Sequence, residues 1–232
     1  MTGKDLFDEE DIKRIQTEYD SLVSNLIRCN KPGDRELIEK AFKVANEAHW
    51  NMRRKSGEPY VIHPICVAKI VNQEIGLGPR SIATALLHDV VEDTGYSLEQ
   101  VNREFGPKIA SLIDGLTKIS ATYNKGATSS MQAENFRRML LTISDDLRVI
   151  LIKIADRLHN MRTLDSMPEN KKMKVAGETI FLYAPLANRL GLYAIKSELE
   201  DLSFKYRQPV LYDEIASKLK VGEKKYYALI NK

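Results

Sequence analysis

The residues best suited to chemistry lie between Leu86 and Gly95, in the sequence LLHDVVEDTG. Positions three or four apart share one face of a helix, so the polar side chains here are predicted to form one strip on an otherwise apolar helix. Carboxylates at the C-terminal end of a helix are unfavourable because the helix dipole is negative there, so we expect a compensating cation. With an imidazole adjacent, a divalent metal ion is the simplest such cation. The strip consists of His88, Asp89, Glu92 and Asp93.

An adjacent His-Asp pair also occurs at solvated helix ends, and this alternative is the common one for an isolated pair. Two further residues favour the metal site, because His63 and Asp156 each lie in apolar sequence. Imidazole and carboxylate ligands suit a borderline or hard divalent ion better than a thiolate site would. A buried, unpaired Asp156 is costly, and two explanations stay open for it: a metal ion, or pairing with the neighbouring Arg157.

The elements that must position these residues are predicted to be helices throughout. Apolar residues recur with the helical period, and prolines, glycines and capping residues separate the segments. Residues 147–155 are apolar nearly all round, which predicts a helix buried in the centre of the domain. No β pattern of useful length appears, so the predicted fold class is all-α. Helices are predicted over residues 8–29, 34–50, 64–76, 79–93, 97–105, 108–120, 131–143, 147–163, 168–189, 196–206 and from 209 onward, with a surface loop at 121–130.

Two groups of polar residues flank the predicted metal site along the chain. Residues 53–55 (RRK) form a basic loop shortly before His63. Adjacent cations repel one another, so they either extend into water, which is the usual outcome, or converge on an anion. Beyond Asp156, Asn160 and Thr163 stand at i+4 and i+7, so one polar face emerges from a buried helix.

Composition limits the class of protein. The chain has 232 residues, of which 43% are hydrophobic and 29% charged, and these values are ordinary for a soluble globular protein. A net charge of +3 is too small to argue for direct nucleic-acid binding. No apolar run approaches the roughly 20 residues of a membrane span, and the polar N-terminus MTGKDLFDEED is no signal peptide. Cys29 and Cys66 are expected to be reduced thiols in a cytoplasmic protein.

Longer segments of the chain carry a resemblance to a known family. The order His63, then His88-Asp89, then Asp156 is similar to that of the HD-domain metal-dependent phosphohydrolases. Within that superfamily, the chain resembles the hydrolase region of the RelA/SpoT homologue family from about Leu37 to Pro209. The segments that carry the resemblance are RRKSGEPYVIHP, LLHDVVEDTGYSLEQVNREFG, LIDGLTKIS, KIADRLHNMRTLDSMP and APLANRLGLYAIKSELEDLSFKYRQP.

The resemblance implies an HD-domain helical bundle with a central metal site and a C-terminal helical extension. It implies hydrolysis of the alarmone (p)ppGpp at the 3′-pyrophosphate, giving GDP or GTP plus pyrophosphate, with bound Mn²⁺, in stringent-response control. The hydrolase domain is expected over residues 1–195, and residues 196–232 are expected to form an extension leading toward a synthetase domain. Synthetase and regulatory domains are expected in the full-length chain, so this sequence is expected to be a fragment.

The resemblance also assigns roles by position. The Mn²⁺ ligands are expected to be His63, His88, Asp89 and Asp156. Glu92 and Asp93 take the place of a catalytic pair near the attacking water, and which of them is the acid stays open. The guanine is expected to lie between two walls, formed by Arg54, Lys55 and Ser56 on one side and by Asn160 and Thr163 on the other.

Two alternatives stay open beside this hydrolase. One is another HD-domain nucleotide phosphohydrolase, against which the full set of motifs argues. The other is a non-catalytic guanine-nucleotide-sensing module. Family members that are inactive in this domain have lost the HD ligands and the acidic pair. This sequence keeps all of them, which favours the hydrolase.

Overall fold

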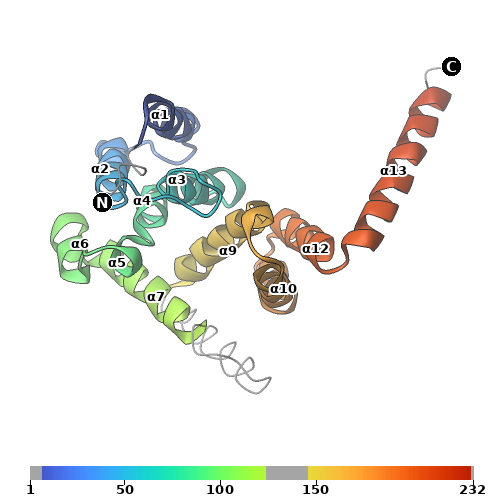
Figure 1. The fold of residues 1–232 in the computed structure, drawn as a ribbon. Coiled ribbons are helices and arrows are strands. Elements are labelled where there is room, and N and C mark those ends of the chain that lie inside the picture. The colour runs from blue at the N-terminus through green and yellow to red at the C-terminus, as the bar shows by residue number, and fades with distance from the viewer. Residues whose placement is uncertain (1–6, 124–145, 231–232) are drawn as a thin grey trace. The chain divides into compact units, whose positions relative to one another are not determined.

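Residues 7–123 and 146–230, the part of the chain that the computed structural model describes, are built from helices (Figure 1). Within these ranges no β-strand occurs, and an isolated bridge joins Arg53 to Pro59 in a loop. The predicted all-α class is therefore confirmed. In chain order the helices are α1 (Glu9–Ser24), α2 (Asp34–Ala48), α3 (Ile62–Lys69), α4 (Pro79–Leu87), α5 (Val90–Asp93), α6 (Leu98–Phe105), α7 (Pro107–Tyr123), α9 (Leu147–Arg162), α10 (Glu169–Glu178), α11 (Ala184–Arg189), α12 (Tyr193–Arg207) and α13 (Pro209–Ile230), with π- or 3₁₀-helical turns at Ile70–Glu74, Leu164–Ser166 and Thr179–Tyr183.

The chain divides into two compact units, Met1–His159 and Asn160–Lys232. The first unit holds α1 to α7 and most of α9, and the second unit holds α10 to α13. The functional boundary expected at residue 195 stays a prediction, because compactness does not show which residues a reaction needs.

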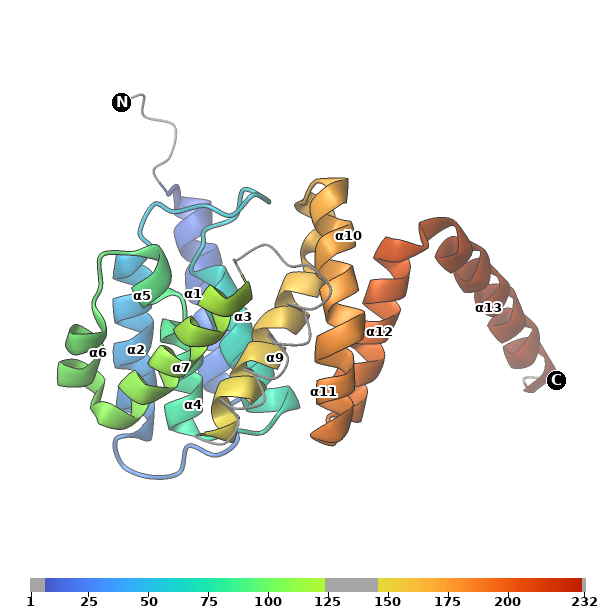
Figure 2. The ribbon, with the colours of Figure 1, turned by 90° about the horizontal axis from the view of Figure 1, so that it is seen from below.

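Helix α4 forms the centre of the first unit. It packs against α2, α3 and α7 (Figures 1 and 2). Every residue from Ser81 to Leu87 is buried, and Ile82 and Leu86 have no exposed surface. Burial of one large aliphatic side chain contributes about 1.5–3 kcal/mol relative to exposure. Helix α4 is therefore a rigid support for the residues that follow it.

The prediction that the polar strip lies on a single helix is wrong, because the helix is interrupted. Helix α4 begins at Pro79, as predicted, but it ends at Leu87; His88 and Asp89 form a turn, and the short α5 follows. In a continuing helix the Asp89 N–H would donate to the Ala85 carbonyl. That carbonyl lies 2.8 Å from His88 Nδ1 instead, so a side-chain hydrogen bond takes the place of the backbone one.

Helix α9 is buried in the first unit, as its apolar sequence predicts. Ile150 and Ile154 have no exposed surface. The helix begins after Asp146, whose carboxylate accepts a hydrogen bond from the Arg148 backbone N–H at 3.0 Å. The side chains of Arg148 and Lys108 also pair with this carboxylate, at 2.7 and 2.9 Å. These contacts fix the start of the helix that carries Asp156.

Two predictions between α7 and α9 are covered only in part. Helix α7 continues to Tyr123, past the end predicted near residue 120. The helix predicted at residues 131–143 and most of the loop predicted at 121–130 lie outside the described residues.

The second unit is assembled around α12. Helices α10 and α11 pack against α12, and α13 contacts it just beyond Pro209. The Arg162 guanidinium donates to both carboxylate oxygens of Glu198 at 2.6 Å each, which ties the end of α9 to α12. In the described ranges of both units, no helix combines the length and the apolar character that crossing a membrane requires.

Candidate metal centre

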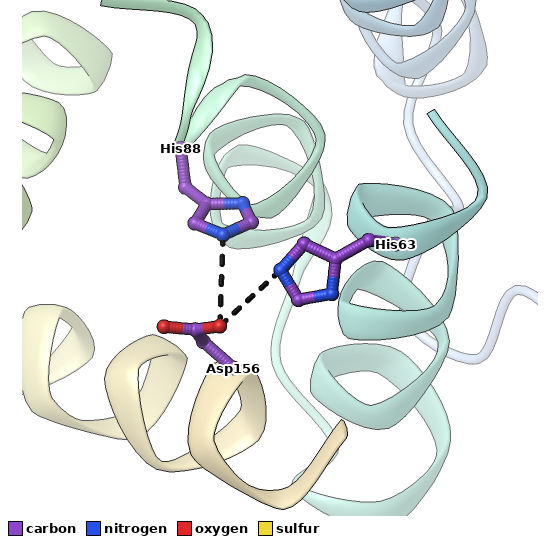
Figure 3. A group of neighbouring side chains, drawn as sticks. All are labelled: His63, His88 and Asp156. Carbon is purple, nitrogen blue, oxygen red and sulfur yellow. Dashed lines mark ion pairs between the residues drawn. The ribbon is translucent and has the colours of Figure 1, made fainter. Parts of the chain in front are cut away.

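Helices α3, α4 and α9 bring two imidazoles and a carboxylate together (Figure 3). His63 is the second residue of α3, His88 follows the last residue of α4, and Asp156 lies on α9. Their possible ligand atoms all lie within 4.8 Å of one another. All three side chains are buried, with exposed fractions of 2% for each histidine and 6% for Asp156. The structure thus gathers three residues that are far apart in the sequence.

The spacing of these atoms suits a shared ion. Asp156 Oδ1 lies 3.3 Å from His63 Nε2 and 3.9 Å from His88 Nε2, along the dashed lines of Figure 3. Ligand atoms about 2.1 Å from one ion at a tetrahedral angle would stand about 3.4 Å apart. Asp89 places Oδ1 3.1 Å from His88 Nε2 and Oδ2 3.7 Å from His63 Nε2. Asp89 falls outside the group within 4.8 Å, so its role as a fourth ligand stays a prediction.

His88 is oriented by its own helix. Its Nδ1 lies 2.8 Å from the Ala85 carbonyl oxygen, so Nδ1 carries a hydrogen and donates it. The other ring nitrogen, Nε2, is buried and makes no hydrogen bond to the described residues. The carboxylate oxygens nearest to it, Asp89 Oδ1 at 3.1 Å and Asp156 Oδ1 at 3.9 Å, pair with it by charge without a hydrogen bond. A buried imidazole nitrogen that faces two carboxylates in this way is a donor set that fits a divalent metal ion.

His63 is oriented by two further side chains. Its Nδ1 lies 2.7 Å from Nδ1 of His159, and that same His159 atom lies 3.4 Å from Nη1 of Arg54. Arginine can only donate, so His159 Nδ1 is the acceptor and His63 Nδ1 carries a hydrogen. The lone pair of His63 then lies on Nε2, the atom that faces Asp156. Partners of this kind fix the tautomer and the orientation of a ligating histidine.

The ionisation of Asp156 depends on the cations around it. Burial raises the pKa of the Asp156 carboxyl, but the Lys153 ammonium and the two imidazoles outweigh burial and hold that pKa well below its usual range. Lys153 Nζ lies 2.8 Å from Asp156 Oδ2. Lys153 is one turn before Asp156 on α9, and it adds a third explanation to the two that the sequence left open.

The two histidine ligands differ in charge. Burial lowers the pKa of His88, but the carboxylates of Asp89 and Asp156 raise it more, to about 9. Burial also lowers the pKa of His63, and there the opposing carboxylates do not restore it. Near pH 7, His63 is therefore neutral and His88 is protonated. His88 must lose this proton to bind a metal, because only a neutral imidazole offers a lone pair.

Tyr60 links the metal centre to α5. Its hydroxyl oxygen lies 2.9 Å from Asp89 Oδ2 and 2.6 Å from Asp93 Oδ2. Burial raises the pKa of Tyr60, and the two carboxylates raise it further, so the hydroxyl keeps its hydrogen. The hydroxyl has a single hydrogen, so it donates a hydrogen bond to one of the two carboxylates at a time. The Tyr60 ring stacks on the buried His49, with ring centroids 4.8 Å apart, which holds the hydroxyl in place.

Comparison with protein families matches residues 41–193 to the HD domain. The chain belongs to the HD domain family. The matched range contains His63, the His88-Asp89 pair and Asp156, in the order that suggested this family. The three residues that the structure gathers, His63, His88 and Asp156, therefore all lie within the matched domain.

Three relatives are similar over most of this HD-domain chain. A Synechocystis sp. protein named "probable guanosine-3′,5′-bis(diphosphate) 3′-pyrophosphohydrolase" is 52% identical over 78% of this chain and 24% of that protein. A GTP pyrophosphokinase of Myxococcus xanthus is 48% identical over 82% of this chain and 25% of that protein. A guanosine-3′,5′-bis(diphosphate) 3′-pyrophosphohydrolase of Aquifex aeolicus is 41% identical over 93% of this chain and 29% of that protein. The chain thus spans about a quarter of the length of these relatives.

A solved structure shares the fold of this HD domain. It is described as "A metazoan ortholog of SpoT hydrolyzes ppGpp and plays a role in starvation responses". It matches with a TM-score of 0.55 and 24% identity, over 74% of this chain and 96% of that one. This likeness confirms the predicted HD-domain helical bundle. Together with the relatives, it confirms the resemblance to the RelA/SpoT homologues.

The HD domain presents the other residues predicted in the first unit at its surface. Glu92 and Asp93 are both exposed on α5. Arg54 is half-buried beside His159, whereas Lys55 and Ser56, which follow it, are exposed. The structure therefore connects Asp93 and Arg54 to the metal centre through one residue each, Tyr60 and His159. The catalytic and base-binding roles stay predictions.

The remaining two predicted residues belong to the second unit. Asn160 lies one turn beyond Asp156 on α9, and Thr163 comes just after the end of that helix at Arg162. Asn160 and Thr163 are both half-buried. Their role as a wall of the guanine site stays a prediction.

Three residues of the site were not singled out in the sequence. Lys153 and His159 stand three residues before and after Asp156, so helical spacing places both on its face and was a usable signal. Tyr60 stands three residues before His63, but it lies in the turn that leads into α3, where no helical spacing applies. Its contact with Asp89 depends on how that turn folds.

Proposed function

We propose that this HD domain hydrolyses (p)ppGpp at the 3′-pyrophosphate, giving GDP or GTP plus pyrophosphate, with Mn²⁺ as cofactor. The proposal rests on the convergence of His63, His88 and Asp156, with a buried imidazole nitrogen that makes no hydrogen bond to the described residues. The names of the Synechocystis and Aquifex relatives support this substrate. The name of the Myxococcus relative supports a synthetase domain in the full-length protein, and the greater length of the relatives leaves room for the expected regulatory domains.

The cation would be held by His63, His88 and Asp156, with Asp89 as the fourth ligand. When bound, it neutralises phosphate charge and lowers the pKa of a water molecule toward neutrality. The carboxylate donors suit manganese, and the resemblance to the RelA/SpoT homologues favours this ion over the others that imidazole binds. Three of these donors are buried side chains at the start of α3, after the end of α4 and within α9, so little reorganisation of the backbone is needed when the ion arrives.

The reaction needs two proton transfers. Hydrolysis breaks the bond between the ribose 3′ oxygen and the adjoining phosphorus; the hydroxyl of water goes to phosphorus, and its other hydrogen goes to the 3′ oxygen. We assign these transfers to Glu92 and Asp93, whose side chains are exposed on α5. The Tyr60 hydroxyl contacts both Asp93 and Asp89, so the surroundings of Asp93 differ from those of Glu92. Two acids in different surroundings suit opposite roles in proton transfer.

Selection of guanine is assigned to the basic loop. Arg54, Lys55 and Ser56 would contact the base, and Asn160 and Thr163 would form its other wall. A guanidinium stacks on a planar base and donates to the acceptor edge of guanine. Replacing guanine by adenine in the substrate should lower kcat/KM by about tenfold or more, which corresponds to about 1.4 kcal/mol. Equal rates for both bases would contradict this assignment.

Product analysis tests the proposed function. Purified protein with Mn²⁺ would be incubated separately with ppGpp, pppGpp, dGTP and cyclic nucleotides, with chelator-treated protein as the control. We expect pyrophosphate plus GDP or GTP from the first two compounds only. Turnover of dGTP or a cyclic nucleotide would indicate another HD phosphohydrolase, and binding of ppGpp without product would indicate a sensing module. The substrate and the reduced cysteines both fit the proposed location in the cytoplasm.

A further inference from the structure

A pocket of the first unit, outside the metal centre, is lined by positive charge. Its volume is about 800 Å³, which lies in the range of small-molecule sites. Its walls come from the connection between α1 and α2, from the start of α4 and from the start of α9. Its charged lining residues in the described part of the chain are Arg28, Lys31, Arg80, Arg148 and a single acid, Asp34.

This pocket is separate from the metal centre. Arg80 is near the start of α4, and His88 follows the end of that helix. Arg148 is near the start of α9, and Asp156 lies farther along it. Each pair is separated by eight residues, which at 1.5 Å per residue is about 12 Å. Two helices therefore carry pocket residues near their starts and lead to metal ligands about 12 Å farther along.

The acids near the pocket do not neutralise it. Asp34, whose carboxylate accepts a hydrogen bond from the Lys31 backbone N–H at 2.9 Å, is one negative charge beside the four cations of the lining. Asp146 accepts from Nε and Nη2 of Arg148 at 2.9 and 2.7 Å, but it also pairs with Lys108 at 2.9 Å. One carboxylate thus balances two cations. The guanidinium of Arg148 is also held in a fixed orientation at the rim.

Three cations of the pocket have no acidic partner. Among the described residues, no ion pair involves Arg28, Lys31 or Arg80, and all three side chains are exposed. Like charges that face one pocket repel one another, and a bound anion would reverse that repulsion. Guanidinium groups are suited to phosphate because their N–H groups match two phosphate oxygens at once.

The rest of the lining is apolar. Leu37, Leu77, Pro32 and Pro79 contribute side chains to the pocket. At Gly78 a side chain would meet no atom within 4 Å, so the wall is open to a ligand there. A ligand that joins several negative charges to a flat, partly apolar ring matches both kinds of lining.

We propose that this pocket binds a nucleoside polyphosphate, with the phosphates against Arg28, Lys31 and Arg80 and the base along Leu37 and Leu77. A small ligand fits better than a nucleic acid, because the cations gather around one pocket and the chain as a whole carries a net charge of only +3. The proposal does not depend on the hydrolysis proposed above, since it uses neither the metal nor the acidic pair.

Binding to the metal-free full chain tests the proposal. Calorimetric titration in the presence of chelator would use GTP and inorganic tripolyphosphate as probes. We expect both to bind, with GTP the tighter because of its base. The double variant Arg28→Gln/Arg80→Gln should weaken GTP binding at least tenfold. The matched control Lys13→Gln/Arg103→Gln removes two exposed cations outside the pocket and should change affinity less than twofold.

Backbone amide resonances give the location directly. GTP should shift the amide signals of Gly33, Gly78 and Arg148 in the metal-free protein. Equal loss of affinity in the two double variants would overturn the proposal, and so would the absence of GTP binding at millimolar concentration. Tighter binding of a short RNA than of GTP would also overturn the proposal, because it would show that the pocket binds a nucleic acid. Failure of ppGpp hydrolysis would leave these results unchanged, so the two proposals fail separately.

Discussion

His63 and His88 present Nε2 to the same point for different reasons. The ring of His88 is held by the main-chain carbonyl of Ala85 in the preceding helix, a group that every amino acid at that position would supply. The ring of His63 is held by the side chain of His159, whose acceptor role is set by Arg54. The orientation of the His63 ring therefore depends on another side chain, whereas that of the His88 ring depends on the main chain.

Replacing His159 tests this control. His159→Ala removes the acceptor of the His63 Nδ1–H, so His63 can change tautomer or rotate, and affinity for Mn²⁺ should fall by about 10- to 100-fold. His159→Asn keeps an acceptor oxygen and should recover part of the loss. Manganese titration followed by electron paramagnetic resonance measures both. Unchanged affinity in His159→Ala would show that the hydrogen bond does not matter.

The acidic pair gives a second prediction at this scale. Glu92→Gln and Asp93→Asn keep the size of the side chain but remove its proton-transfer capacity, so each should lower kcat by about 10² to 10⁴. Manganese content should be retained, because His63, His88 and Asp156 are untouched. Glu99→Gln, at an exposed acid on α6, serves as the control and should keep full activity. If the amide variants lost the metal instead, the pair would be ligands.

At the scale of elements, hydrophobic period and helix signals predicted much of the structure. Pro79 marks the start of α4, and the apolar run before Asp156 is buried in α9, as expected. The break at His88 and Asp89 was not predicted. It arises because the His88 ring competes for a backbone carbonyl, and a periodic pattern contains no information on such a competition.

The same limit applies to the candidate site. His63, His88 and Asp156 were found because polar residues in apolar sequence need an explanation, and the family order then joined them. Tyr60 and Lys153 were not found, because their contacts depend on the path of a turn and on a charge that is ordinary at a helix surface. Contacts between distant segments are visible only after the chain has folded.

The start of α9 gives a prediction on pH. Hydrogen bonds from Arg148 hold the pKa of Asp146 below its ordinary value of 3.8. A carboxyl whose pKa is lower in the folded state stabilises the fold above its unfolded pKa and loses that contribution as pH falls below it. Asp146→Asn should therefore lower the urea midpoint at pH 7, and the difference from wild type should narrow between about pH 4 and pH 2.

A matched acid controls this measurement. Glu47 is exposed on α2 in the same unit, and no ion pair involves it among the described residues. Glu47→Gln should shift the urea midpoint little at any pH. A deficit in Asp146→Asn that stayed constant down to pH 2 would mean that the carboxylate charge does not act at the helix start.

At the scale of the whole molecule, the three gathered ligands all belong to the first of two units. Metal should therefore stabilise that unit, by about 2.7 kcal/mol when Mn²⁺ is present at 100 times its Kd. Trp50 is the one tryptophan of the chain and lies in the first unit, so its fluorescence follows the unfolding of that unit. Chelator should lower the midpoint seen by Trp50. Asp156→Ala should abolish the response to Mn²⁺, and an equal gain in this variant would contradict the assignment.

The positions of the metal ligands along their helices restrict where residues can be inserted or deleted during evolution. An α-helix turns by about 100° per residue, so one residue inserted in α9 ahead of Asp156 would swing its carboxylate away from the two imidazoles. One residue removed from α4 would do the same to His88, because its position is counted from the buried helix behind it. In connections such as that between α1 and α2, an inserted residue does not rotate a metal ligand out of its position. Related chains are therefore expected to gain and lose residues in their connections, while the counts within α3, α4 and α9 stay constant.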